Sequence, residues 1–241
     1  MRNIVFHPDT DSIGTRNQAT RDEWLEKTLL GIRAGTTILD AGAGELQYKK
    51  FCSHLAYVSQ DFCQYDGVGD KRSNQHSRWD TSRIDIVSDI TAIPREDESF
   101  GAIMCVEVLE HVPDPVATIK ELSRLLEKGG WLIITAPFCS LTHQSPFHFC
   151  DGFNRYFYEK HLEEMGFEIR DISTNGNFFE YMAQEIRRIP WMADYYCGRQ
   201  LSFREKALLL MVKQMLAKFG SKDRGSDEML CLGHHVLARK L

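Results

Sequence analysis

Short apolar runs alternate with longer stretches of mixed polarity along most of the chain. Several of these runs are apolar almost throughout, which is typical of parallel strands that are covered on both faces. We expect strands at Thr36 to Ala41, Ala56 to Phe62, Ile84 to Ile90, Gly101 to Val108, Trp131 to Ala136, Phe167 to Ile172 and Leu230 to Ala238.

The clearest helical pattern follows the fourth of these strands. Asp114 can cap this helix, and Pro115 suits its first position. Gly129 and Gly130 are expected to end it. Apolar residues recur at a spacing of three and four and form one stripe: Val116, Ile119, Leu122 and Leu126.

The alternation of strand and helix favours βαβ units, and therefore a doubly wound α/β fold with helices on both faces of the sheet. A second helix is expected from Arg155 to Met165, stopped by Gly166. We interpret residues 1–241 as one domain that carries a helical insert at 175–227, between the last two strands. This insert could cover an acceptor pocket or form a homodimer interface, or its aromatic residues could form a small core of their own.

Composition and charge narrow the functional class. Hydrophobic residues make up 43% of the chain and charged residues 26%, which is ordinary for a globular protein. The net charge of -5 gives no overall basic surface and disfavours nucleic acid as a partner. The longest apolar run, Ala207 to Val212, is far shorter than the ~20 residues of a membrane span.

The cysteines and the N-terminus bear on the compartment. The cysteine count of 7 is odd and no Cys-x-x-Cys pair occurs, which disfavours a disulfide framework or a cysteine zinc site. The first residues, Met1 to Asp9, lack the apolar core of a signal peptide. We therefore expect a cytoplasmic protein.

A glycine pair stands where the first strand hands over to an expected helix. Gly42 and Gly44 allow a sharp turn and close approach to a ligand, and a helix N-terminus would offer free N–H groups. The dinucleotide fingerprint would need glycine where Gln47 stands. Asp40 would oppose a pyrophosphate but suits a cationic amino group. A simple tight turn is the alternative interpretation.

Two more acids are expected at the ends of the next strands. Asp61 stands where doubly wound folds place a carboxylate against ribose hydroxyls. Asp89 could accept from an exocyclic amino group while Ile90 packs against the base. Each acid alone is equally typical of a helix cap or a solvated loop, but ligands bind at this edge of such sheets.

Five segments in order, ILDAGAG, YVSQDF, DIVSDITAIP, GAIMCVEVLEHVPDP and LLEKGGWLIITAP, resemble the class I S-adenosylmethionine-dependent methyltransferases. The resemblance covers Thr36 to Ile172 and resumes in the last strand. It implies S-adenosylmethionine as cofactor, and a seven-stranded mixed sheet with the last strand inserted antiparallel.

The resemblance also implies a set of cofactor-binding residues. The glycine turn would hold the methionine part, Asp61 the ribose, and Val106 and Glu107 the floor near the sulfonium. Many members have a third glycine where Leu46 stands. The implied set is Asp40, Ala41, Gly42, Gly44, Asp61, Phe62, Asp89, Ile90, Val106 and Glu107.

Methyl transfer to a hydroxyl needs in-line positioning and a base. The candidate bases are His111, His143 and His148, with Asp151 close to the last two in sequence. Each could instead be an ordinary packed or solvent-facing loop histidine.

The run Glu107-Val-Leu-Glu110-His111 resembles a metal-binding run of certain RNA and quinone O-methyltransferases. Two carboxylates and an imidazole are suitable metal ligands. The same run is common in members without a metal, so we expect no metal here.

The acceptor is expected to be a hydroxyl of a small molecule or glycan, because His148 to Phe167 resembles the corresponding part of methyltransferases acting on sugars or small secondary metabolites. The polar region Tyr65 to Ser82 is expected to close over the cofactor. A nicotinamide-dependent oxidoreductase is disfavoured by Asp40 and the missing third glycine. A non-catalytic cofactor-binding protein, and an RNA methyltransferase with a local basic surface, stay open.

Overall fold

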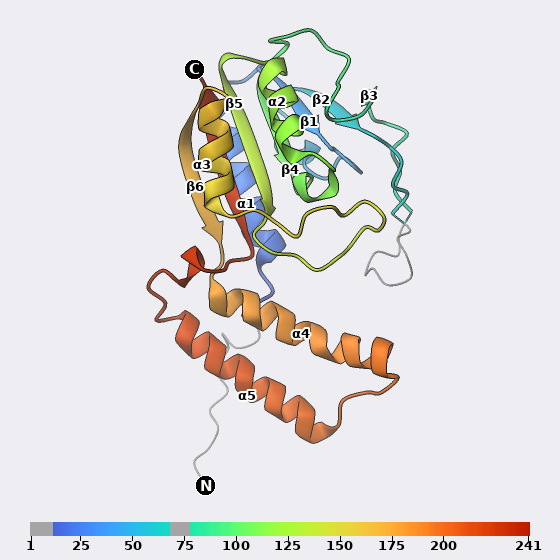
Figure 1. Cartoon of the computed structure of the whole chain (residues 1–241), viewed down its shortest axis with the longest axis vertical. Helices are drawn as coiled ribbons and strands as arrows, with labels where there is room; N and C mark the ends of the chain where they lie inside the picture. Colours follow the sequence, from blue (N-terminus) through green and yellow to red (C-terminus); the bar gives the residue numbers. More distant parts are fainter. Residues whose placement is uncertain (1–11, 68–77) are drawn as a thin grey trace. The chain divides into compact units, whose positions relative to one another are not determined.

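The structure, a computed structural model, describes residues 12–67 and 78–241. The chain divides into two compact units. We call Asp22–Ser173 with Gly233–Leu241 the sheet unit, and Met1–Arg21 with Thr174–Leu232 the helical unit. Figure 1 shows the elements of both.

The sheet has seven strands in the order β3-β2-β1-β4-β5-β7-β6. Strands β1 to β5 pair in parallel, whereas β7 lies between β5 and β6 and runs antiparallel to β5. The predicted seven-stranded mixed sheet with an inserted antiparallel last strand is therefore confirmed. The strands are β1 Thr37–Ala41, β2 Ala56–Asp61, β3 Ile86–Val87, β4 Phe100–Val106, β5 Leu126–Pro137, β6 Phe167–Asn175 and β7 Gly233–Lys240.

Alternate residues of the strands point to opposite faces of the sheet, and helices cover both faces. The three helices that cover it are α1 (Asn17–Leu30), α2 (Pro115–Leu125) and α3 (Arg155–Glu164). Leu39 and Ile103 pack in one core with α2 and α3. Ile38 and Met104 pack in another core with α1. Figure 1 shows α2 and α3 on the same side of the strands.

Both predicted helices begin where expected, α2 at its predicted cap and α3 at Arg155. The Asp114 side chain accepts a hydrogen bond from Ala117 N at 2.8 Å, and Pro115 is the first residue of α2. In α3 the cap is Asn154, which accepts from Phe157 N at 3.2 Å.

The expected end of α2 at the glycine pair is wrong. The helix ends at Leu125, and Leu126 begins β5 opposite Phe100. Gly129 and Gly130 lie inside β5, where the register with β4 is irregular. A Cβ on Gly130 would lie 3.0 Å from a β4 carbonyl oxygen, so this pair serves close strand packing rather than a helix stop.

The expected helix after the glycine turn is also wrong. Turns and a short 3-10 helix, Lys49–Phe51, connect β1 to β2 instead. Helix α1 was not predicted, since most of its residues are polar and only Leu25 and Leu29 are buried. Apolar periodicity is too sparse there to indicate a helix.

Strand β3 is much shorter than the predicted Ile84 to Ile90. The residue before it, Asp85, turns its carboxylate to β2 and accepts from Ser59 N at 2.9 Å and from Ser59 Oγ at 2.7 Å. Asp89 therefore follows the strand instead of ending it.

The helical unit contains α4 (Phe178–Cys197) and α5 (Phe203–Gly220), within the stretch predicted to hold two helices. Its core joins Ile13, Ala183 and Leu216. A capping box at Ser202 starts α5. The role of this stretch as a lid or a dimer interface stays a prediction.

All seven cysteines are unpaired. Within the described ranges no helix has both the length and the apolar character needed to cross a bilayer.

Candidate functional site

Strands β1, β2, β4 and β5 are parallel, so their carboxyl ends share one edge of the sheet, which we call the carboxyl edge. Backbone strain is found in the segment after each of these ends. Non-glycine residues have positive φ there: Leu46 (63°), Cys63 (55°), Glu107 (54°) and Gln144 (52°). Such conformations cost roughly 1–2 kcal/mol each and cluster at functional sites. Leu46 thus takes a conformation that suits glycine.

The glycine turn is held by the end of β2. Gly42 N and Ala43 N both donate to the Gln60 carbonyl oxygen at 2.9 Å. Gly44 N donates to Asp61 Oδ2, also at 2.9 Å. The expected helix N-terminus with free N–H groups does not follow this turn, and the amides of the turn itself donate to β2.

Both glycines have positive φ and little room for a Cβ. Gly42 has a φ of 80°, and a Cβ there would lie 2.5 Å from Val108 Cγ2. Gly44 has a φ of 50°, and a Cβ there would lie 3.0 Å from Trp79 Cζ3. Their part in binding a ligand stays a prediction.

Asp61 is the last residue of β2 and only 6% exposed. Its Oδ2 accepts from Gly44 N and its Oδ1 accepts from Cys63 N at 2.7 Å. These bonds fix the carboxylate in one orientation. Each carboxylate oxygen has a second lone pair, so the group keeps acceptor capacity for a diol.

Asp40 is 1% exposed, and its Oδ2 accepts from the Tyr57 hydroxyl at 2.5 Å. Burial raises the pKa of Asp40 to about 7, the Tyr57 hydrogen bond lowers this pKa, and the charge of Asp61 raises it further. The predicted contact of Asp40 with a cationic amino group stays a prediction.

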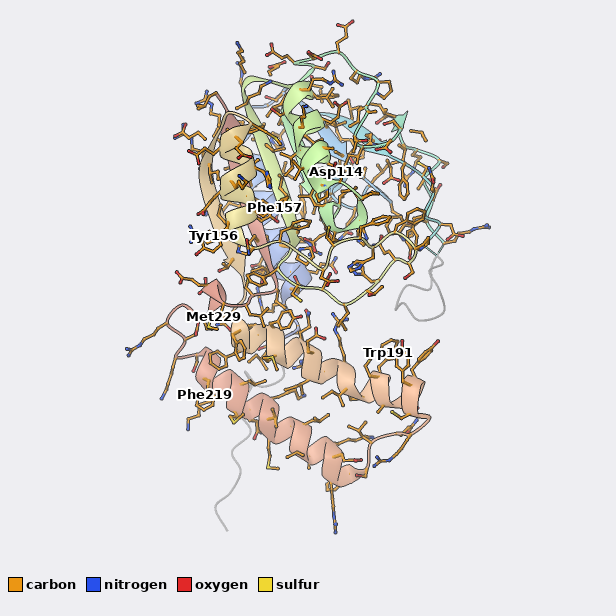
Figure 2. The ribbon with its side chains drawn as sticks, viewed as in Figure 1. Asp114, Tyr156, Phe157, Trp191, Phe219 and Met229 are labelled. Carbon is orange, nitrogen blue, oxygen red and sulfur yellow. The ribbon has the colours of Figure 1, made fainter. Side chains whose placement is uncertain are left out.

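Figure 2 draws side chains of the described residues as sticks. Four aromatic side chains, which we call the aromatic group, lie beside Asp61 and the glycine turn: Phe62, Tyr65, Trp79 and Phe147. The ring centroids of Phe62 and Phe147 are 4.9 Å apart, and those of Tyr65 and Trp79 are 5.1 Å apart. Sequence analysis missed Trp79 and Phe147 because loops carry no periodic pattern. Residues 68–77 of the expected flap lie outside the described residues.

Three other predicted cofactor contacts, two at the adenine and one near the sulfonium, have local partners. Asp89 is exposed, and its Oδ1 accepts from Thr91 N and Thr91 Oγ1 at 2.8 Å. Ile90 is 7% exposed and packs in the core with α2. Val106 is 6% exposed and packs in the opposite core. Their contacts with a cofactor stay predictions.

The three candidate histidines meet in one cluster, although they come from two segments. His111 belongs to a 3-10 helix after β4, and His143 and His148 belong to the loop after β5. The ring centroid of His143 lies 4.6 Å from that of His111 and 4.8 Å from that of His148. We call these residues the histidine cluster.

His111 is the buried member of this cluster. Its Nδ1 lies 2.5 Å from the Phe147 carbonyl oxygen, which can only accept, so Nδ1 carries the proton. Its Nε2 is buried without a hydrogen-bond partner in the described part of the chain, and lies 3.7 Å from Glu110 Oε1. Burial lowers the pKa of His111 to about 4, and the nearby His143 lowers it as well. The ring is therefore neutral at pH 7.

The other two histidines are more accessible. His143 is half-buried, and its Nδ1 lies 2.9 Å from the Leu141 carbonyl oxygen, which leaves Nε2 as the acceptor nitrogen. His148 Nε2 lies 3.1 Å from Ser140 Oγ. Burial lowers the pKa of His148, and the charge of Asp151 opposes this shift. Asp151 therefore lies near His148, as expected.

Glu110, His111 and His143 can offer ligand atoms that all lie within 4.8 Å of one another. This group differs from the run predicted from the sequence, because His143 takes the place of Glu107. The Glu107 carboxylate instead accepts from Thr135 Oγ1 at 2.9 Å.

A family model described as a methyltransferase domain matches residues 39–134. The chain is 45% identical over 53 residues to the ubiquinone biosynthesis O-methyltransferase of Xanthomonas oryzae pv. oryzae, a match that covers 22% of this chain and 21% of that protein. It is 28% identical over 171 residues to the demethylmenaquinone methyltransferase of a Mycobacterium species, covering 69% of this chain and 67% of that one.

Solved structures share the fold. The Haemonchus contortus phosphoethanolamine N-methyltransferase 2, solved with S-adenosyl-L-methionine, superposes with a TM-score of 0.52 and 16% identity over 92% of this chain and 52% of that chain. The region matched by the family model contains the glycine turn, Asp61 and the Glu107 to His111 run. Residues 39–134 are therefore similar to a methyltransferase domain, and the chain shares the fold of solved methyltransferases.

Proposed function

We propose that this chain transfers a methyl group from S-adenosylmethionine to a hydroxyl oxygen of a small-molecule or glycan acceptor. The carboxyl edge has two halves: a cofactor half, with the glycine turn and Asp61, and an acceptor half, with the histidine cluster. One residue, Phe147, carries the proposal because it contacts both halves. Its ring packs against Phe62, next to Asp61, and its carbonyl oxygen accepts from His111. A cofactor held by Asp61 would thus lie near the histidine cluster.

The cofactor half of the edge fits this ligand. When bound, S-adenosylmethionine supplies a methyl group on a positively charged sulfur. Asp61, fixed by two backbone amides, would accept from both ribose hydroxyls. The aromatic group would offer flat apolar surfaces to the adenine. The glycine turn would let the backbone approach the methionine part.

In the acceptor half we assign the base to His143. Its Nδ1 is oriented by the Leu141 carbonyl, so Nε2 can take the proton of the acceptor hydroxyl. His111 and His148 both lie against it and would hold its ring in position. His111 itself is too buried to meet an acceptor directly.

Two acceptor chemistries are consistent with the proposal. The names of two relatives point to rings of the quinone type, and one of these names specifies O-methylation. The resemblance of His148 to Phe167 points to sugars. We further propose that the chain acts in the cytoplasm, where seven unpaired thiols stay reduced.

The test uses the full chain with S-adenosylmethionine that carries a labelled methyl group. One panel contains ring compounds with phenolic hydroxyls and the other contains free and nucleotide-linked sugars. We expect label in one panel and loss of that label with His143→Asn. Label only on amine or carbon acceptors would contradict the choice of a hydroxyl.

A second candidate, metal-assisted O-methylation, is favoured by the group Glu110, His111 and His143. A divalent cation there would bind the acceptor oxygen and lower its pKa. Under our first proposal, activity persists after treatment with a chelator. Complete loss, with recovery on adding Mg²⁺, Mn²⁺ or Zn²⁺, would instead support the metal. Glu110→Gln should then abolish calorimetric binding of the metal alone.

A further inference from the structure

Helix α5 is apolar on two sides, although packing against α4 requires only one. Val212 and Leu216 pack in the core of the helical unit with α4. A second set of large apolar residues recurs at a spacing of three and four, and therefore shares one face of the helix. This set, which we call the outer stripe, is Leu208, Met211, Met215 and Phe219, with exposed fractions of 55%, 52%, 47% and 47%.

Cationic side chains stand at both ends of the outer stripe. Arg204 precedes Leu208 by one helical turn, and Lys218 and Lys222 lie beyond Met215 at the other end. All three cations are exposed. The stripe is thus an apolar centre between two basic ends.

The surrounding segment is basic in an acidic chain. From Arg199 to Arg224 there are seven Lys and Arg but two acidic residues, a net charge of +5 against -5 for the whole chain. Both acids are engaged locally. Glu205 accepts from Arg199 and from the Ser202 cap, and Asp223 accepts from nearby backbone amides.

We propose that the outer stripe of α5 docks onto an anionic phospholipid surface, with the helix lying in the plane of the headgroups. Helices that lie in a membrane interface combine an apolar face with Lys and Arg beside it. The apolar side chains would enter the acyl boundary, and the flanking cations would meet phosphate groups.

The charges argue against a second copy of this chain as the occupant. Two copies of α5 related by a two-fold axis and packed antiparallel through the stripe would bring Arg204 of one copy towards Lys218 of the other. Like charges in such an interface are unfavourable. An anionic bilayer neutralises the same charges.

The opposite side of α5 supplies a matched control. Lys206 and Lys213 do not lie on the stripe. They line a cavity of ≈ 250 Å³ between α4 and α5, together with Ile186, Pro190 and others. Lys206→Gln therefore removes a cation from the same helix without touching the outer stripe.

The test measures flotation of the full chain with two kinds of vesicle, phosphatidylcholine alone and phosphatidylcholine mixed with phosphatidylglycerol. We expect binding to the anionic vesicles only, weakened by high salt. The triple variant Arg204→Gln, Lys218→Gln, Lys222→Gln should lower the partition coefficient about a hundredfold, because each cation near the surface contributes about fivefold. Lys206→Gln should change it about twofold or less.

A second variant tests the apolar part. Leu208→Gln with Met215→Gln keeps good helix formers at exposed positions, so circular dichroism should not change. Its partition coefficient should fall about tenfold or more. Wild-type protein that binds neutral and anionic vesicles equally, or neither, would overturn the proposal. So would a dimer in sedimentation that this variant dissociates, which would make a second copy the occupant. None of these results depends on methyl transfer.

Discussion

The two halves of the carboxyl edge differ in how their polar groups are satisfied. In the glycine turn, the amides of Gly42, Ala43 and Gly44 all donate to β2 at 2.9 Å. In the histidine cluster, His111 Nε2 is buried without a hydrogen-bond partner among the described residues, and lies 3.7 Å from a Glu110 oxygen.

This difference has an energetic meaning. A buried polar group without a partner costs about 1–3 kcal/mol, whereas a paired one is close to neutral. The amides of the glycine turn therefore have hydrogen-bond partners before any ligand binds. The acceptor half carries a cost that a cation bound between His111, Glu110 and His143 would remove. We infer a rigid platform for the cofactor and an adaptable wall for the acceptor.

The largest expected effect is a loss of catalysis that leaves cofactor binding nearly unchanged. His143→Asn keeps a donor for the Leu141 carbonyl but removes the acceptor nitrogen. We expect kcat to fall on the order of a hundredfold or more, because a general base is lost. Calorimetry should show cofactor affinity within about threefold of wild type. His161→Asn, in α3 and outside the cluster, is the control; an equal loss of kcat in both variants would contradict the assignment.

The rigidity of the glycine turn can be measured as stability. Gly42→Ala places a Cβ 2.5 Å from Val108 Cγ2 at a φ of 80°. Urea unfolding should show a loss of roughly 3 kcal/mol, from the positive φ and from overpacking together.

Gly35→Ala is the matched control for that variant, because Gly35 also has a φ of 80° but nothing within 4 Å of the added Cβ. It should cost only about 1 kcal/mol. Val108→Ala should recover part of the loss in Gly42→Ala. Equal losses at both glycines would show that contact with Val108 does not explain Gly42.

The buried acid of the cofactor half predicts a pH dependence. Burial raises the pKa of Asp40 from 3.8 to about 7 in the folded state. The folded protein therefore holds this proton more tightly than the unfolded chain. The stabilising contribution is fully present below pH 3.8 and is lost as pH rises through about 7.

Asp40→Asn removes this titration. Between pH 5 and 7, the unfolding free energy of wild type minus that of Asp40→Asn should fall, at most by about 1.4 kcal/mol per pH unit. It should level off above pH 7. A difference that rises over the same range would show that Asp40 ionises readily in the folded protein.

The smallest expected effect concerns the ribose ligand. Asp61→Ala should weaken binding of S-adenosylmethionine about tenfold or more, on the order of 1.4 kcal/mol, because a charged acceptor for the diol is lost. Asp61→Asn, which keeps one carbonyl acceptor, should lose less. Near-unchanged affinity in Asp61→Ala would remove Asp61 from the cofactor site.

The sheet could be predicted from the sequence because its strands are buried on both faces, which produces apolar runs such as GAIMCV. The start of α2, with Asp114 as its cap and Pro115 as its first residue, could also be predicted, because capping depends on neighbouring residues alone. The inserted antiparallel β7 came only from the resemblance. Helix α1 escaped because so few of its residues are buried.

The site was predictable one residue at a time but not as an arrangement. Each histidine was a candidate, yet a single sequence does not show that His143 reaches His111 from another loop. The aromatic residues Trp79 and Phe147 left no signal because loop residues lack periodicity. The glycine turn differs from the prediction in one respect. The amides of Gly42 and Ala43 donate to β2, and a Cβ at Gly42 would collide with Val108.

The central claim, that the carboxyl edge is a preformed S-adenosylmethionine site, is tested most directly by calorimetric titration of the full chain. S-adenosylmethionine, S-adenosylhomocysteine and NAD are titrated in parallel. We expect micromolar binding of the first two and none of NAD. Binding of NAD alone would contradict it.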